Sequence, residues 1–193
     1  MSDSYHHGNL RQALIDAGVR IINESGEDSL SLRKVALRCK VSHAAPYAHF
    51  KDKEELVEAI KTSVTEQFME ELNSAVNGAP TAEAAILEMG KRYITFFLHK
   101  PDYFKFLFGN QNITAHLQSD ADSDNDYPPF VLLKKTYLKY LEENKITKDK
   151  NEQEIDILRI WSSAHGLASI ACMSGVVPSF DWEEMMKTDI LLR

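Results

Sequence analysis

The chain has little of what several classes of protein require. Only two of its 193 residues are cysteines, and because Cys39 and Cys172 lie far apart we expect neither a disulfide framework nor a zinc site. No segment approaches the roughly 18 consecutive apolar residues of a membrane-spanning helix. No apolar run follows a basic segment near the start, as it would in a secretory signal, so we predict a cytoplasmic protein.

The usual motifs of enzymes are also lacking. The sequence has no glycine-rich phosphate loop, no His-Glu-x-x-His and no serine in a nucleophile elbow. Its seven histidines do not have the spacing of a metal site. We therefore expect no catalysis, no cofactor and no metal.

Helical periodicity is present along nearly the whole chain, and no hairpin of alternating strands is evident. This pattern predicts an all-α protein, with a three-helix N-terminal domain over residues 1–54 and a larger helical domain over residues 55–193. The segment 118–129 has four acids and two prolines, which predicts a solvated loop. The expected helices cover residues 10–24, 31–38, 43–50, 53–76, 102–108, 129–144, 151–174 and 181–192. Thr81 is placed to cap a further helix that begins after it.

Residues 31–56 predict two short helices around a tight turn, followed at once by a third helix. Ser31 can cap the first short helix, whose apolar face includes Leu32 and Val35. Residues 39–41 would make the turn, and Ser42 is placed to cap the second helix. A helix-turn-helix protein inserts this second helix into the major groove of DNA.

The side chains expected to contact DNA lie in or beside this motif. The outward residues of the second helix offer hydrogen-bond donors, acceptors and a methyl group, which suit base edges and thymine methyls. The lysines that follow suit phosphates better. The predicted DNA-binding residues are Ser31, Arg33, Ser42, His43, Ala44, Ala45, Tyr47, His49, Lys51 and Lys53.

The overall charge argues against nucleic acid, but its distribution does not. The chain has 22 basic and 29 acidic residues and a net charge of -7. Between residues 31 and 53 there are six basic side chains and one acidic one, a local net charge of +5. A basic reading surface on an acidic protein should bind non-specific DNA weakly and lose affinity steeply with salt.

The sequence around the second helix resembles the TetR family of bacterial regulators. Tyr47, His49, Phe50, Lys53 and Leu56 fit the pattern Tyr-x-His-Phe-x-x-Lys-x-x-Leu, which closes the DNA-binding domain of that family. Residues 5–10 and the helix after them are similar to its basic arm and first helix. Residues 44–47, Ala-Ala-Pro-Tyr, together with Trp161, His165 and Gly166, resemble one of its subgroups.

Two positions depart from the family pattern. Lys40 stands where the family usually has glycine, in a turn that favours left-handed backbone. Pro46 removes an internal hydrogen bond of the second helix and disfavours helical geometry at Ala45, which predicts a distorted start to that helix.

The two helices expected over residues 129–144 and 151–174 predict a dimer interface. A helix-turn-helix reader of a palindrome needs a symmetric pair of subunits, and the resemblance implies a four-helix bundle made by the last two long helices of each subunit. One helix offers large residues at helical spacing, and the other offers small residues that let a partner approach. The predicted interface residues are Phe130, Leu133, Tyr137, Leu141, Ser162, Gly166 and Ser169.

Aromatic residues of the larger domain predict a mostly apolar ligand pocket with a few polar groups. The candidate lining residues are Tyr93, Phe97, Phe104, Phe108, Trp161 and His165. The resemblance implies that a small-molecule effector bound there releases a repressor from double-stranded operator DNA. Ordinary core packing is the alternative for each residue. A DNA-binding regulator with no effector, whose larger domain serves only dimerisation or protein contact, is the alternative for the whole chain.

Overall fold

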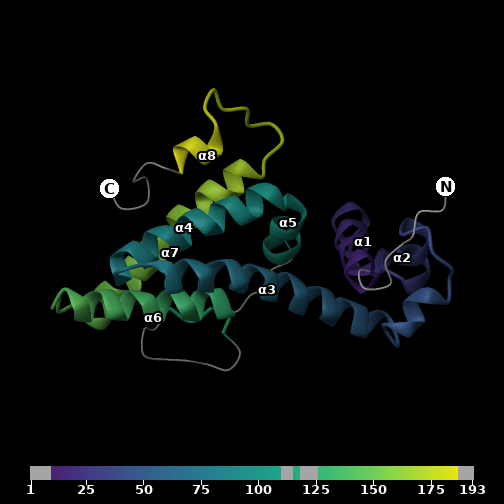
Figure 1. The fold of residues 1–193 in the computed structure, drawn as a ribbon, viewed down its shortest axis with the longest axis horizontal. Helices are drawn as coiled ribbons and strands as arrows, with labels where there is room; N and C mark the ends of the chain where they lie inside the picture. Colours follow the sequence, from purple (N-terminus) through teal and green to yellow (C-terminus); the bar gives the residue numbers. More distant parts are fainter. Residues whose placement is uncertain (1–9, 110–114, 118–125, 187–193) are drawn as a thin grey trace.

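The computed structural model describes residues 10–109, 115–117 and 126–186. Over these residues the secondary structure is entirely helical, which confirms the predicted fold class. Figure 1 shows α1 and α2 at one end of an elongated molecule, α4, α6 and α7 at the other end, and α3 running between them. None of the described helices combines the length and apolar character that crossing a bilayer demands.

The head is the unit formed by α1 (Leu10–Ser25), α2 (Leu32–Arg38), the short element η2 (Ala45–Ala48) and the first turns of α3 (Lys53–Gly78). Ser31 caps α2 as predicted, since its Oγ accepts a 3.2 Å hydrogen bond from the Lys34 amide. Helices α1 and α3 approach each other closely at Gly18, where a Cβ would lie 2.5 Å from Cδ1 of Ile60. Phe50, with 1% of its surface exposed, closes this small core.

Helix α3 belongs to both ends of the molecule. Its 26 residues span about 39 Å at the usual rise per residue. Leu56 and Ile60 are buried against the head, and Phe68 and Leu72 are buried in the body, the unit formed by the rest of the chain. The domain boundary expected after residue 54 therefore falls within the first turn of a continuous helix.

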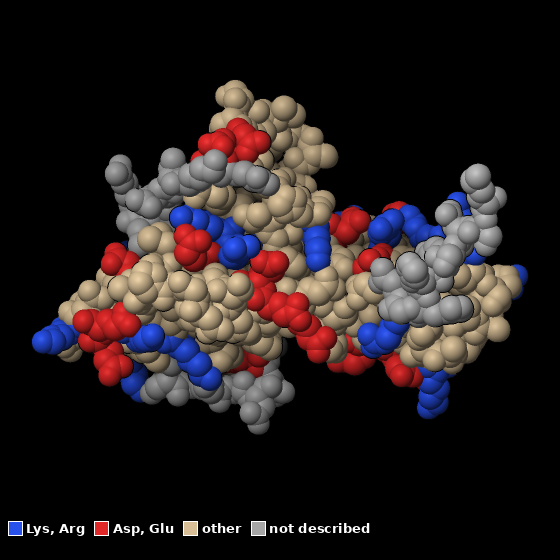
Figure 2. All heavy atoms as spheres, viewed as in Figure 1, with Lys and Arg blue, Asp and Glu red and all other residues tan. Residues whose placement is uncertain are grey.

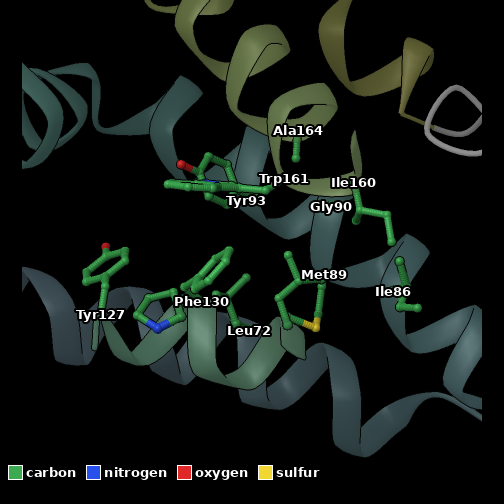
Figure 3. Close-up of a pocket in the computed structure, with 12 residues that line it drawn as sticks. Leu72, Ile86, Met89, Gly90, Tyr93, Tyr127, Phe130, Ile160, Trp161 and Ala164 are labelled. Carbon is green, nitrogen blue, oxygen red and sulfur yellow. The ribbon is translucent and has the colours of Figure 1, made fainter. Parts of the chain in front are cut away.

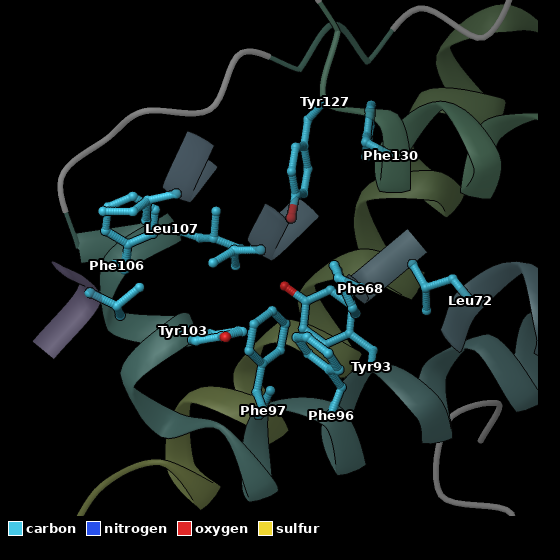
Figure 4. Close-up of a cluster of buried hydrophobic side chains, with 14 of the residues drawn as sticks. Phe68, Leu72, Tyr93, Phe96, Phe97, Tyr103, Phe106, Leu107, Tyr127 and Phe130 are labelled. Atoms are coloured by element: carbon cyan, nitrogen blue, oxygen red, sulfur yellow. The ribbon is translucent and has the colours of Figure 1, made fainter. Parts of the chain in front are cut away.

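In the body, α4 (Ala82–His99) and α6 (Pro128–Glu143) pack against the second half of α3, and α7 (Lys150–Ala171) packs mainly against α4. Aromatic rings fill its centre: Phe68 lies 5.0 Å from Tyr93 and 4.8 Å from Phe97 between ring centroids (Figure 4). Thr81 caps α4 as predicted, by accepting a hydrogen bond from Ala84. Helix α5 (Pro101–Gly109) packs against α1 of the head. The last expected helix is present as α8 (Trp182–Met185), and residues 187–193 lie outside the described residues.

The acidic segment before α6 differs from the solvated loop that its composition predicts. Residues 118–125 lie outside the described residues, but Asp126 has only 5% of its surface exposed. Its carboxylate lies 2.6 Å from Nδ1 of His116 and 3.1 Å from Nζ of the buried Lys134. Hydrogen bonding from His116, with further support from Lys134, lowers the pKa of Asp126 to about 2. The end of this segment is therefore an anchor for the start of α6.

Candidate DNA-binding and effector sites

The second element of the helix-turn-helix is shorter than predicted. The structure has a single 3-10 turn, Ala45–Ala48, instead of a helix over residues 43–50. Pro46 has no N–H, and its ring disfavours helical geometry at Ala45, which explains the short element. The turn begins with a 3.0 Å bond from the Ala45 amide to the backbone carbonyl of Ser42. The side-chain cap predicted for Ser42 is therefore wrong, because the turn uses its backbone.

The turn before this element has the strained backbone that the sequence predicts. Lys40 has a φ of 56°, in the left-handed region where glycine is favoured. The Lys40 amide donates to the carbonyl of Leu37 at 3.1 Å, and the Val41 amide donates to that of Ala36 at 3.0 Å. A residue with a Cβ costs roughly 1 kcal/mol in this conformation, and these bonds hold it there.

The predicted DNA-contact residues differ in how accessible they are. Ser42, His43, Ala44 and Tyr47 are exposed, and Tyr47 has 62% of its surface exposed although nothing in the chain requires an exposed tyrosine there. We call these four residues the tip. Around it, Arg33 and Lys51 are exposed, while Ser31, Ala45, His49 and Lys53 are half-buried.

Two features of the head were missed by sequence reasoning. Leu37, at the end of α2, has 71% of its surface exposed beside the turn, where an apolar side chain could meet a thymine methyl. Arg38 forms a two-pronged ion pair with Glu24 of α1, at 2.5 Å for each contact, and this pairing lowers the pKa of Glu24. The local charge of +5 therefore overstates what the head offers to phosphates.

Acidic side chains separate the head from the body. Helix α3 carries six acidic residues and two lysines. Figure 2 shows acidic atoms crossing the middle of the viewed face, between the two ends of the molecule. Like charges repel, so this acidic surface is unfavourable for a DNA backbone.

The body contains an apolar cavity between α3, α4, α6 and α7. It encloses about 540 Å³ including its mouth and is narrow (Figure 3). Of the predicted pocket residues, only Tyr93 and Trp161 line it. The complete lining is Leu72, Ile86, Met89, Gly90, Tyr93, Tyr127, Pro129, Phe130, Leu133, Ile160, Trp161 and Ala164.

The other predicted pocket residues lie beside the cavity instead of on its wall. Phe97 is fully buried in the aromatic core. The rings of Phe104 and Phe108 pack on His165, at 5.1 and 4.6 Å between centroids. Phe108 and His165 also line a second, more open hollow beside α7, which Trp161 shares. Sequence spacing could not separate a cavity wall from the core behind it, because both are apolar faces of the same helices.

The polar side-chain groups on the described wall of the cavity are the hydroxyls of Tyr93 and Tyr127 and the indole N–H of Trp161. The Tyr93 hydroxyl lies 2.8 Å from Nδ1 of His165. Burial lowers the pKa of His165 and raises that of Tyr93, so both side chains are neutral near pH 7. The Tyr127 hydroxyl is buried and has no hydrogen-bond partner among the described residues.

The structure corrects part of the predicted dimer interface. Phe130, Leu133, Tyr137 and Leu141 have between 2% and 7% of their surface exposed, because they pack inside their own subunit. They cannot offer a surface to a partner, so this part of the prediction is wrong. The helical spacing identified an inward face of α6.

Helix α7 does present a face to solvent. Ser162 is exposed, and Gly166 and Ser169 are half-buried. A Cβ added at Gly166 would meet nothing within 4 Å. The same face carries exposed apolar residues that sequence reasoning missed, with exposed fractions between 44% and 52%. The α7 face comprises Ile155, Leu158, Ser162, Gly166 and Ser169, spaced by three or four residues, and the exposed Met173 follows two residues after the helix ends.

Comparison with known proteins places the N-terminal region in a family. Residues 14–60 match the family model for bacterial regulatory proteins of the tetR family. The HTH-type nicotine-responsive transcriptional repressor HdnoR of Paenarthrobacter nicotinovorans is 36% identical over 74 residues, which are 38% of this chain and 38% of that repressor. The chain thus matches little more than a third of this relative's length.

Solved structures resemble the chain over nearly its full length. A protein from Rhodococcus sp. RHA1 is 24% identical, with a TM-score of 0.68, over 96% of this chain and 94% of its own. The transcriptional regulator FadR from Bacillus subtilis, in complex with stearoyl-CoA, is 14% identical, with a TM-score of 0.60, over 86% of this chain and 99% of its own. At these identities the likeness shows the fold. Residues 14–60 thus resemble the tetR family of bacterial regulatory proteins and form the helix-turn-helix part of the head, and the all-helical fold of the chain resembles that of the FadR structure.

Proposed function

We propose that the chain is a cytoplasmic, homodimeric transcriptional repressor that binds a palindromic DNA operator and is released by a small-molecule effector. The observation that carries this proposal is the tip, where His43, Ala44 and Tyr47 are exposed beside a left-handed turn and two lysines. Folding gains nothing from exposing a large tyrosine there. A DNA base edge is the surface that these side chains complement.

The dimer is proposed to form through the α7 face. A palindrome read by helix-turn-helix domains has half-sites about 34–36 Å apart, so two heads must be held at a fixed distance. A continuous helical face of small and apolar residues lets two copies of α7 pack closely about a two-fold axis. Gly166, with open space at its Cβ position, lies within this face.

The subgroup resemblance gains a physical interpretation from these positions. Trp161 lines the cavity, and His165 lies 2.8 Å from the Tyr93 hydroxyl at the cavity wall. Gly166 lies on the α7 face. One turn of α7 would therefore connect the proposed effector site with the proposed dimer interface.

Effector release requires that the body can move the head, and two connections could do this. Leu72 lines the cavity from α3, whose first turns belong to the head. Helix α5 carries Phe108, which packs on His165, and also holds α1: Lys105 Nζ donates to the Asn23 carbonyl at 2.7 Å. An effector that favours a different spacing of the heads by about 1.4 kcal/mol changes operator affinity tenfold.

A regulator without an effector is the alternative, and the narrowness of the cavity favours it. In that case the cavity would be a packing defect of the body. The DNA-binding and dimer parts of the proposal would be unaffected.

A pair of glycine variants tests the dimer and the DNA reader together. The Cβ that Gly166→Leu adds would meet nothing within 4 Å, so we expect the variant monomer to stay folded. We expect it to shift the protein from dimer to monomer in sedimentation experiments and to weaken operator binding more than tenfold. Gly78→Leu makes the same change at another open helical position and should alter neither property. A dimeric Gly166→Leu protein with unchanged affinity would contradict the proposed interface.

A further inference from the structure

The unpaired hydroxyl of Tyr127 marks the cavity as a site for a ligand. Tyr127 has 9% of its surface exposed, and its hydroxyl lacks a partner within the described ranges, 10–109, 115–117 and 126–186. A buried hydroxyl without a hydrogen bond destabilises the folded state. The other wall residues are almost all apolar, so they offer the Tyr127 hydroxyl no hydrogen bond that would offset this loss of stability.

The two tyrosine hydroxyls of the cavity face each other across a gap. Figure 4 shows the hydroxyl ends of Tyr127, the residue just before α6, and of Tyr93 on α4 pointing toward one another. No hydrogen bond joins them: the Tyr93 hydroxyl pairs with Nδ1 of His165, and the Tyr127 hydroxyl has no partner among the described residues. A polar atom placed in this gap would be within reach of the Tyr127 hydroxyl.

The chemistry of the wall restricts what can occupy the cavity. The described lining has no charged side chain, and burial raises the pKa of Tyr127, so its hydroxyl stays protonated. An anion or cation would lose its hydration without gaining a counter-charge. The phosphates of a coenzyme A thioester, the ligand class in the FadR structure, would find no cationic partner on this wall.

We propose that the effector is a small, neutral, largely apolar molecule with one hydrogen-bond acceptor, such as a carbonyl oxygen, that receives the Tyr127 hydroxyl proton in a hydrogen bond. The aromatic walls formed by Tyr93, Phe130 and Trp161 suit a flat molecule. This inference rests on the effector site of the proposed function and specifies its ligand.

Three matched probes test the acceptor requirement. Acetophenone has a carbonyl, α-methylstyrene has the same shape with a methylene in place of the oxygen, and benzoate carries a charge. By titration calorimetry, acetophenone should bind the full chain at least tenfold more tightly than α-methylstyrene, which is about 1.4 kcal/mol, and benzoate should not bind. In Tyr127→Phe the first two probes should bind within about twofold of each other.

The stability of two unliganded variants gives a second, independent measurement. Tyr127→Phe removes an unpaired hydroxyl, so its melting temperature should equal or exceed that of the wild type. Tyr93→Phe removes a hydroxyl that is bonded to His165, so its melting temperature should fall. The two substitutions are chemically identical and lie on the same cavity.

Several results would overturn the inference. In the binding experiment, the inference fails if acetophenone does not bind the wild type, if acetophenone and α-methylstyrene bind equally, or if benzoate binds tightly. In the stability experiment, it fails if Tyr127→Phe has a lower melting temperature than the wild type. Operator binding measured without any probe separates this failure from failure of the proposed function. A protein that binds its operator but none of the probes would refute the ligand class alone.

Discussion

The hydroxyl of Tyr103 on α5 donates a 2.7 Å hydrogen bond to the carboxylate of Asp16 on α1, and so joins the body to the head. Tyr103 is buried, and burial together with the neighbouring carboxylate raises its pKa to about 12. Asp16 also accepts a 2.9 Å bond from Gln12 within α1. The head is therefore connected to α5 through the Asp16 carboxylate, which Gln12 of the same helix, α1, holds in position.

Tyr103→Phe should loosen this connection. Losing a hydrogen bond to a charged group should reduce the free energy of unfolding by about 2 kcal/mol. Amide hydrogen exchange should become faster in α1 than in the wild type, with little change in α7. Tyr140→Phe, on α6 far along the chain from this contact, is the matched control. Unchanged exchange in α1 would show that the bond does not hold the head.

Tyr47→Ala should weaken operator binding without affecting the fold. Its side chain is 62% exposed, so its removal creates no cavity. Loss of a base contact should cost at least about 1 kcal/mol of binding free energy, measured by fluorescence anisotropy, with an unchanged circular dichroism spectrum. Val177→Ala removes a body side chain that is 89% exposed and should have no effect. If Tyr47→Ala and Val177→Ala bind the operator with the same affinity, Tyr47 does not contact the DNA.

Lys53→Ala should weaken binding to every DNA sequence alike. A lysine that neutralises a phosphate releases counterions, so its loss should flatten the dependence of log affinity on log salt by about one unit. Lys61→Ala, two turns further along α3, should leave the slope unchanged. A loss confined to one sequence would assign Lys53 to base recognition instead.

Asp126→Asn should destabilise the body by removing a carboxylate charge that lies 3.1 Å from Nζ of the buried Lys134. The pKa of Asp126 is about 2 in the folded protein, below the usual value of 3.8. Its contribution is therefore complete above pH 4 and is lost as the pH falls toward 2. The difference in melting temperature between the wild type and the variant should be largest near pH 7 and shrink below pH 4. A difference that does not depend on pH would contradict this account.

Local rules predicted the helices well, because caps and periodicity act within a few residues. The Ser31 and Thr81 caps and the left-handed Lys40 all occur as predicted. Pro46 was correctly identified as disruptive, but the sequence did not predict that the second helix would be reduced to a single 3-10 turn, Ala45–Ala48.

Long-range relationships could not be read from the sequence. Helical spacing showed that Phe130 and Tyr137 share a face of α6, but not that this face meets its own subunit. The acidic composition before α6 predicted an exposed Asp126. It is buried because it pairs with Lys134, which lies eight positions later on α6. The Tyr127 hydroxyl is unpaired because no hydrogen-bond partner lies near it among the described residues, and a local sequence pattern cannot show this.

Selection of bound sequences from a random DNA pool, with the purified full chain at moderate salt, measures whether the protein is a dimeric sequence reader. We expect enrichment of a palindrome whose half-sites are about one helical turn of DNA apart or a multiple of it, and loss of that enrichment in Gly166→Leu. A single unpaired half-site, or no enriched sequence from a protein that sedimentation shows to be a folded dimer, would contradict a dimeric sequence reader.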